Sequence, residues 1–251
     1  MYANFKKTVN HLIGEILHLV STSYISFISR RNKNRIYIFT DSRGSAIEKM
    51  SSRRNALTNS YILSCAKNYH VTPRIAIDKY TSIIDFIHCV ETNKIDLNSY
   101  QKVILHLGVV DFSPRPLSSL FEMEDRKRIK LNFLGLDVQH KYYDTMYCNE
   151  KTASFLSIDD VIQLLDKYPY LKNCIWVLSN RVLLNWDGNY WKARPSNINK
   201  ILDYNKCLIE NGCKVVELKW TDQEIIKYTC DNIHPNRIGF TIIDKYISEL
   251  V

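Results

Sequence analysis

The fold of this chain is set by the stretch Ile36-Tyr37-Ile38-Phe39-Thr40-Asp41-Ser42-Arg43-Gly44. Its first four residues are apolar, and β-branched and aromatic side chains dominate them, which is typical of a buried strand. The Asp-Ser-Arg-Gly sequence that follows is typical of a tight turn. Four more apolar runs are expected to form strands, and they lie at residues 71–77, 103–108, 174–178 and 215–218.

Segments with the helical spacing of apolar residues separate these strands. They lie at 82–90, from Ser157 onward, at 198–210 and at 237–250. Strands that alternate with helices, each strand being a near-continuous apolar run, predict a parallel sheet covered on both faces. The sequence therefore predicts an α/β sandwich of three layers around a central, mainly parallel, five-stranded sheet.

Residues capable of nucleophilic catalysis follow the first strand and precede the last helix. In such folds ligands collect at the carboxyl ends of the strands, where Ser42 lies. The segment Asp231-Asn232-Ile233-His234-Pro235 lies near the other end of the chain. A three-residue offset lets one loop hold the Asp231 carboxylate against Nδ1 of His234, so that Nε2 can take the proton of a serine. We therefore predict Ser42, Asp231 and His234 as catalytic residues.

Each of these elements has a simpler interpretation. Asp41-Ser42 followed by Gly44 is also a sequence that caps a helix, and His234-Pro235 is also an ordinary turn. Their joint occurrence at two expected loop positions favours catalysis.

Three short motifs resemble those of the SGNH/GDSL hydrolases. Thr40-Asp41-Ser42-Arg43-Gly44 is similar to the nucleophile block, Gly108-Val109-Val110-Asp111 to the third block, and Asp231-Asn232-Ile233-His234 to the closing block. Their order and spacing match over residues 35–251. The resemblance implies a flavodoxin-like fold and ester hydrolysis or acyl transfer, often on acylated carbohydrates. It makes Arg43, Gly108 and Asp111 candidate substrate-binding residues.

The oxyanion hole departs from the family pattern. The family takes one donor from the serine backbone, one from a glycine of the second block and one from an asparagine of the third. Here Val110 stands at the asparagine position, and residues 76–81 contain no glycine. Losing one such donor typically costs about 10²–10³ in rate. The backbone N–H of Arg43 and the Thr81 hydroxyl are candidate replacements. The alternative function is a catalytically weakened carbohydrate-binding or assembly protein of the same fold.

Two further features bear on the substrate. Arg115 stands between Pro114 and Pro116, which stiffen the backbone, so its guanidinium is a candidate clamp for a carboxylate or phosphate. A surface arginine in a rigid loop is the simpler interpretation. The aromatic segment from Trp186 to Trp191 is a candidate stacking platform for a sugar ring, although such residues more often pack under a loop.

Composition narrows the partners. The formal net charge is +8, but no basic stripe interleaved with aromatic residues is visible, so we expect no nucleic-acid binding. The seven cysteines form no CxxC pair, and the histidines show no ligand spacing, so we expect a reducing, cytoplasmic location, no metal and no cofactor. The resemblance to the SGNH/GDSL hydrolases implies an acylated saccharide or a small ester as the partner.

The first 34 residues are expected to form an amphipathic helix and a basic linker outside the 35–251 domain. Apolar residues recur at helical spacing from Leu12 to Ile28, but Glu15 and two histidines interrupt a membrane span or signal. The helix either docks on the domain or lies on a membrane surface, with the basic residues facing anionic lipid. A long segment at about 117–156 is expected to be an insertion that either acts as a lid or binding loop or is mobile.

Overall fold

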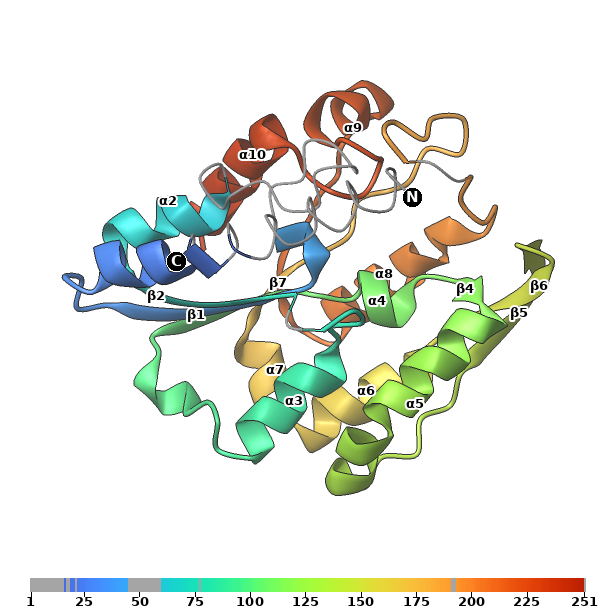
Figure 1. Ribbon diagram of the computed structural model, residues 1–251, viewed down its shortest axis with the longest axis horizontal. Helices are drawn as coiled ribbons and strands as arrows, with labels where there is room; N and C mark the ends of the chain where they lie inside the picture. The colour runs from blue at the N-terminus through green and yellow to red at the C-terminus, as the bar shows by residue number, and fades with distance from the viewer. Residues whose placement is uncertain are drawn as a thin grey trace, which may run out of the picture.

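A parallel five-stranded sheet forms the centre of the molecule (Figure 1). The computed structural model describes residues 16, 19–20, 22–44, 60–76, 78–190 and 193–250. The strands are β1 (Arg35–Thr40), β2 (His70–Ile75), β3 (Lys102–His106), β7 (Ile175–Val177) and β8 (Lys214–Val216). Their order is β2-β1-β3-β7-β8, and every neighbouring pair is parallel. This is the flavodoxin-like order, and the predicted fold class is confirmed.

The side chains of β1 alternate between the two faces of the sheet, and each face has its own hydrophobic core. Ile36 and Ile38 point to one side and Tyr37 and Phe39 to the other, and all four are buried. Successive side chains of a strand face opposite sides of the sheet, so an all-apolar strand requires a cover on both faces.

Helices supply that cover (Figure 1). On the Ile36 side lie α2 (Tyr61–Asn68), α9 (Asp222–Tyr228) and α10 (Arg237–Ser248). On the Tyr37 side lie α3 (Ile83–Glu91), α5 (Leu117–Leu134), α6 (Ile158–Lys167), α7 (Tyr170–Asn173) and α8 (Ile201–Glu210). The predicted capping box of α6 is present, because Ser157 and Asp160 bond each other's backbone N–H. Sequence patterning did not single out α2, α5 or α9.

The segment predicted as an insertion contains regular structure. It holds α5 and the hairpin of β5 (Lys141–Tyr147) and β6 (Glu150–Ser154). With the short β4 (Arg115–Pro116), the hairpin forms a second, antiparallel sheet in the order β4-β6-β5. Because β6 pairs with β4 directly after the third motif, the hairpin is fixed beside the carboxyl end of the main sheet.

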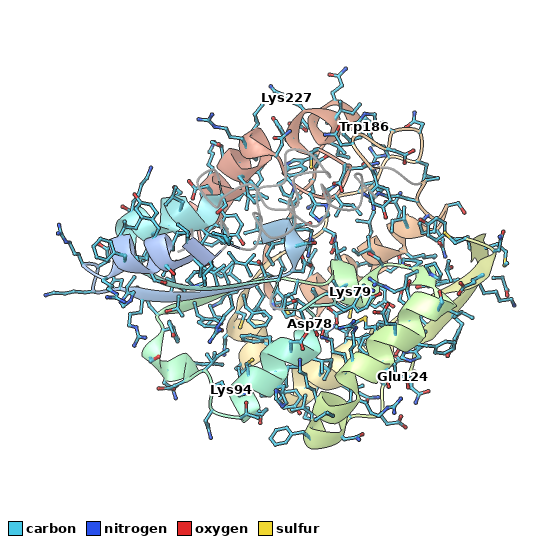
Figure 2. All side chains as sticks on the ribbon, in the orientation of Figure 1. Asp78, Lys79, Lys94, Glu124, Trp186 and Lys227 are labelled. Carbon is cyan, nitrogen blue, oxygen red and sulfur yellow. The ribbon has the colours of Figure 1, made fainter. Side chains whose placement is uncertain are left out.

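Buried charges attach α5 to α3. The Lys127 side chain is fully buried, and its Nζ lies 2.6 Å from an Asp85 carboxylate oxygen and 3.3 Å from one of Asp78. Lys79 lies beside Asp78 in the loop after β2 (Figure 2). Its ammonium group forms an ion pair with Glu122 of α5. A buried charge is tolerated only when it is paired, so these contacts fix the helix to the body of the domain.

Among the described residues, the N-terminal segment is helical at 16, 19–20 and 22–29, and a loop leads from residue 29 to β1. It packs on the side of α2 through Ile25, which is buried. Several residues of the apolar periodicity seen in the sequence, among them Val20, Tyr24 and Phe27, are exposed instead. Ile13 and Leu17 lie outside the described residues. No helix in the described ranges is long and apolar enough to cross a membrane.

Candidate active site

The turn after β1 exposes Ser42. The backbone N–H of Asp41 donates to the carbonyl of His106 on β3 at 3.0 Å, which extends the strand pairing by one residue. The Asp41 carboxylate then accepts the backbone N–H of Arg43 at 2.9 Å, and a short 3₁₀ turn, η1 (Ser42–Gly44), follows. Asp41, Arg43 and Gly44 are buried, and Ser42 alone is exposed.

Gly44 is required by a close approach. A Cβ at this position would lie 2.1 Å from Oγ1 of Thr40, a distance at which the backbone must shift. The turn can fold back over the end of β1 only because this side chain is absent. The Thr40–Gly44 sequence thus sets the direction of the Ser42 side chain.

A small closed loop carries the other two predicted catalytic residues. Thr229 and Pro235 form an isolated antiparallel bridge, and the backbone N–H of Cys230 donates to the carbonyl of His234 at 3.0 Å. Within the loop, the Asp231 carboxylate accepts the backbone N–H of Ile233 at 3.1 Å and that of His234 at 2.7 Å. The carboxylate therefore organises the loop that contains it.

The structure brings Ser42, His234 and Asp231 into one chain of hydrogen bonds. Oγ of Ser42 lies 2.9 Å from Nε2 of His234, and Nδ1 of His234 lies 2.7 Å from an Asp231 carboxylate oxygen. When Nδ1 carries the imidazole proton, Nε2 is free to accept the serine hydroxyl. Ser42 and His234 are 192 residues apart in the sequence, so only the sheet brings them together.

Asp231 remains ionised inside the protein. Its side chain is fully buried, and burial alone would raise its pKa. The charge and hydrogen bonds of His234 and the nearby Arg194 outweigh that effect, and the pKa of Asp231 lies well below its usual range. A buried carboxylate of this kind can orient an imidazole and stabilise the imidazolium.

Sequence analysis did not identify Arg194. Its Nη2 donates to the backbone carbonyl of Asp231 at 2.7 Å and lies 3.3 Å from the carboxylate. The guanidinium also stacks over the Tyr190 ring, with its central carbon 3.9 Å from the ring centroid. In the sequence, the only sign of this role for Arg194 is its position four residues after Tyr190, next to an aromatic segment, and that sign is weak.

Asn232 lies in the loop between Thr229 and Pro235 and connects it to the segment that follows β7. Its side chain accepts the Leu183 N–H at 2.9 Å and donates to the carbonyls of Leu183 at 2.7 Å and Trp186 at 2.5 Å. Its φ is +74°, a left-handed conformation that Asn tolerates better than most residues. Gly188 lies close to the loop between Thr229 and Pro235. A Cβ added at Gly188 would lie 2.5 Å from the carbonyl oxygen of Cys230.

The Arg43 side chain lies inside the fold. It forms an ion pair with Asp41 at 3.0 Å and donates to Oγ of Ser179 and to the carbonyl of Leu107. Only 2% of the side chain is exposed. The guanidinium therefore links the ends of β1, β3 and β7 beneath Ser42, and it is not available to a ligand at the surface.

The third-motif residues also build the frame. Gly108 has φ +109° and precedes the short helix α4 (Val109–Phe112). Asp111 is fully buried and accepts the backbone N–H of Ile83, at 3.2 Å to its nearer oxygen. Arg115 donates to the carbonyl of Val110 at 2.7 Å, so it caps the end of α4 with part of its guanidinium.

The two donors that the sequence offers as replacements in the oxyanion hole already have partners. The N–H of Arg43 is bonded to Asp41, and the Thr81 hydroxyl donates to the carbonyl of Asp78. Both replacements considered for the oxyanion hole are therefore engaged in this structure. Ile77, in the second-motif segment, lies outside the described residues. The neighbouring Ala76 has φ +44°, a conformation that usually selects glycine.

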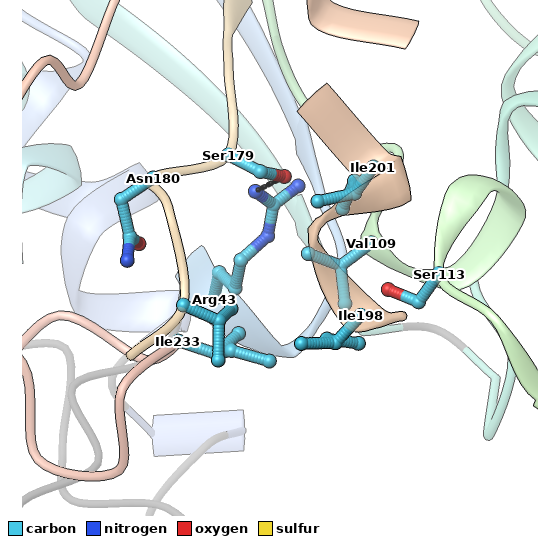
Figure 3. A pocket seen from close by; sticks show the side chains of 9 residues that line it. Arg43, Val109, Ser113, Ser179, Asn180, Ile198, Ile201 and Ile233 are labelled. Atoms are coloured by element: carbon cyan, nitrogen blue, oxygen red, sulfur yellow. Dashed lines mark hydrogen bonds between the residues drawn. The ribbon is translucent and has the colours of Figure 1, made fainter. Parts of the chain in front are cut away.

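A small hollow of about 10 Å³ lies beside the two loops (Figure 3). Arg43, next to Ser42, and Ile233, next to His234, both line it. The other apolar residues around it are Val109, Val182, Ile198 and Ile201. Its walls thus come from the third motif, from the segment after β7 and from the start of α8.

No group of three or more His, Cys, Asp and Glu side chains arranged to hold a metal ion occurs among the described residues.

No protein-family model and no curated protein sequence matches this chain. It is similar to several solved structures at low identity, among them the following two. A lipase/acylhydrolase from Enterococcus faecalis is 11% identical with a TM-score of 0.47, and the match covers 86% of this chain and 94% of that one. A member of the lipolytic G-D-S-L family from Veillonella parvula DSM 2008 is 13% identical with a TM-score of 0.47, and the match covers 86% and 97%.

The fold and the site together define the class of protein. The chain is an α/β protein of flavodoxin-like topology that carries a Ser-His-Asp constellation at the carboxyl end of its central sheet.

Proposed function

We propose that this protein is a serine esterase or O-acyltransferase in which Ser42 is the nucleophile. The observation that carries the proposal is the 2.9 Å contact between the Ser42 hydroxyl and Nε2 of a histidine whose other nitrogen is held by a buried carboxylate. A serine hydroxyl beside an oriented base can act as a nucleophile toward an acyl carbon.

The reaction follows from these contacts. His234 takes the hydroxyl proton as Ser42 Oγ bonds to the acyl carbon, and the electron pair of the carbonyl moves to its oxygen. When the tetrahedral intermediate collapses, the alcohol leaves with the proton from His234, and the acyl group stays on Ser42. Water or a second hydroxyl then gives its proton to His234 as its oxygen bonds to the acyl carbon. The bond from the acyl carbon to Ser42 Oγ breaks, and His234 returns the proton to that oxygen. Hydrolysis and transfer differ only in this acceptor.

The hollow beside the site does not hold the acyl group, because its volume of about 10 Å³ is room for about one water molecule.

An acylated saccharide is the proposed class of ester. Beside the site, the Arg194 guanidinium stacks on the Tyr190 ring, with its central carbon 3.9 Å from the ring centroid. Aromatic faces and arginine together suit the apolar faces and hydroxyls of sugar rings. The seven cysteines, all within the described residues, form no disulfide with one another, which supports the proposed cytoplasmic location.

The second candidate function is a binding or assembly protein of the same fold with weakened catalysis. Val110 at the third-motif position favours it, as do the bonds that occupy the Arg43 N–H and the Thr81 hydroxyl. Without enough donors for the oxyanion, a well-placed nucleophile reacts slowly.

Labelling with a fluorophosphonate probe separates the two functions. The wild-type protein is expected to react at one serine, whereas Ser42→Ala and His234→Ala lose labelling. Ser248→Ala, which changes an exposed serine of α10, is the matched control and should label normally. Labelling that persists in Ser42→Ala would contradict the enzyme proposal, as would folded wild-type protein that does not label.

A further inference from the structure

The N-terminal helix has apolar side chains on two opposite faces. One face is buried through Ile25, which is 1% exposed, and through Ser29, whose hydroxyl lies 3.5 Å from the carbonyl of Val71 on β2. Just beyond the helix, the Asn32 amide donates to the carbonyl of Ala66 at 3.2 Å. These contacts fix the helix against α2 and the edge of the sheet.

The opposite face carries the N-terminal apolar stripe, which consists of Ile16, Leu19, Val20, Tyr24 and Phe27. All five side chains are more than half exposed, and Phe27 reaches 70%. At about 100° per residue, Val20, Tyr24 and Phe27 fall on one side of the helix, and Ile25 points the other way. The helix therefore docks through its smaller apolar face and leaves the larger one uncovered.

An exposed stripe of this kind is unusual on a water-soluble surface. Single exposed apolar residues are common, but a contiguous apolar patch usually marks an interaction site. The docked face alone already holds the helix in place, so the exposed side chains add nothing to that packing.

Positive charge lies beside the stripe. Arg30, Arg31 and Lys33 follow the helix directly and are exposed. The sequence between residues 16 and 35 contains no Asp or Glu, and the whole chain has a formal charge of +8. An apolar face next to unopposed cations complements a surface with an apolar interior and an anionic boundary.

We propose that this face binds an anionic lipid membrane. The stripe inserts at the boundary between headgroups and acyl chains, with the helix axis in the membrane plane, and the three cations contact lipid phosphates. Tyr24 suits the interface because its ring is apolar and its hydroxyl is polar. A second copy of the same face is a poorer partner, because this segment offers no acidic side chain to pair with the cations.

Vesicle flotation tests the proposal directly with the full chain. The wild-type protein is expected to float with vesicles of phosphatidylcholine mixed with phosphatidylglycerol, and only weakly with phosphatidylcholine alone. Leu19→Gln/Phe27→Gln should lower the partition coefficient at least tenfold, since each buried side chain of this size contributes about tenfold or more. The matched control is Phe121→Gln/Ile129→Gln, which changes exposed apolar residues of α5 and should float as wild type does.

A charge series tests the second part. Arg30→Gln/Arg31→Gln/Lys33→Gln should weaken binding to the anionic vesicles about fivefold per residue and reduce its dependence on salt. Lys206→Gln/Lys214→Gln/Lys219→Gln, which removes three exposed lysines elsewhere, should have a much smaller effect.

Two outcomes would overturn the membrane proposal. One is flotation that the stripe variants do not change. The other is a lipid-free dimer in sedimentation experiments that Leu19→Gln/Phe27→Gln dissociates, since a second copy would then be the occupant of this face. Neither outcome bears on Ser42, whose labelling is measured without lipid.

Discussion

Arg194 is bonded to Asp231 twice, because one guanidinium nitrogen lies 2.7 Å from the backbone carbonyl and 3.3 Å from the carboxylate. The carboxylate in turn orients His234. The base couple is thus held by a residue that lies outside all three sequence motifs, and the Tyr190 ring packs against that residue.

Loss of this contact is expected to lower catalysis without unfolding the protein. In Arg194→Met the carboxylate keeps its bonds to the backbone of its own loop but loses its fixed position, so kcat for a small aryl ester should fall about ten- to a hundredfold. KM should change little. Arg128→Met, which changes an exposed arginine of α5, is the control. An unchanged kcat would show that the loop alone orients His234.

Asp231→Asn is expected to have the larger effect. An amide in place of the carboxylate cannot stabilise the imidazolium and favours the wrong tautomer of His234, so kcat should fall by about 10⁴. Steady-state kinetics on protein with an unchanged circular dichroism spectrum would measure this. A loss of less than tenfold would argue against Asp231 as the orienting residue.

Asp111 is expected to make stability depend on pH. Burial raises its pKa from 3.8 to about 7, and Asp85 adds to the rise, while the Ile83 N–H, Lys127 and Arg115 oppose it. Between these values the folded state holds a proton that the unfolded state has lost. This contribution to stability is therefore complete below pH 3.8 and is lost as the pH rises through about 7.

The slope gives the test. A full proton difference lowers the free energy of unfolding by about 1.4 kcal/mol per pH unit. Asp111→Asn keeps an acceptor for the Ile83 N–H but does not titrate, so its urea denaturation between pH 5 and 7 should lack this slope. Asp125→Asn, at an exposed aspartate, should keep it. If the free energy of unfolding depended on pH equally in both variants, Asp111 would not be the group that titrates in this range.

Asn232 is expected to be one of the more sensitive polar residues near the site. Asn232→Ala removes three hydrogen bonds and places a Cβ residue at φ +74°, so the free energy of unfolding should fall by about 2–4 kcal/mol. Asn232→Gly relieves the backbone strain and should cost less. Asn93 is exposed and has a φ of +55°, so Asn93→Ala tests the backbone strain alone. This variant should lower the free energy of unfolding by about 1–2 kcal/mol. If all three variants lowered the free energy of unfolding equally, the side-chain hydrogen bonds of Asn232 would contribute nothing to stability.

Val110 is the position at which activity can be raised. The family resemblance implies an asparagine donor there, so Val110→Asn should increase kcat by about tenfold or more if the amide reaches the oxyanion. Ester hydrolysis by Val110→Asn and by Val110→Thr would be compared, because threonine matches valine in shape and its hydroxyl is shorter. Identical rates in both variants and the wild type would mean that another group already supplies the donor.

Sequence patterning predicted the central sheet well because its strands are buried on both faces. β1, β3 and β7 are short apolar runs with few polar interruptions, and such runs have few other stable environments. The hairpin of β5 and β6 escaped prediction because its outer face is exposed and its sequence mixes tyrosine, aspartate and lysine. The helix α5 escaped it because charged residues lie on most of its surface, and even the buried Lys127 reads as a surface residue.

The sequence by itself determined the α/β class and the two loops that carry Ser42, Asp231 and His234, because strand periodicity and turn chemistry are local properties. Tertiary structure decided what the remaining polar residues do. Arg43 and Asp111 are as polar as any ligand-binding residue, yet both are buried in the frame. Arg194 has no local signature, yet it contacts Asp231. The N-terminal helix shows one apolar stripe in sequence, and only packing determines that this stripe faces outward. The reason is physical: burial and hydrogen-bond partners depend on which segments meet in space, and local patterns do not encode that.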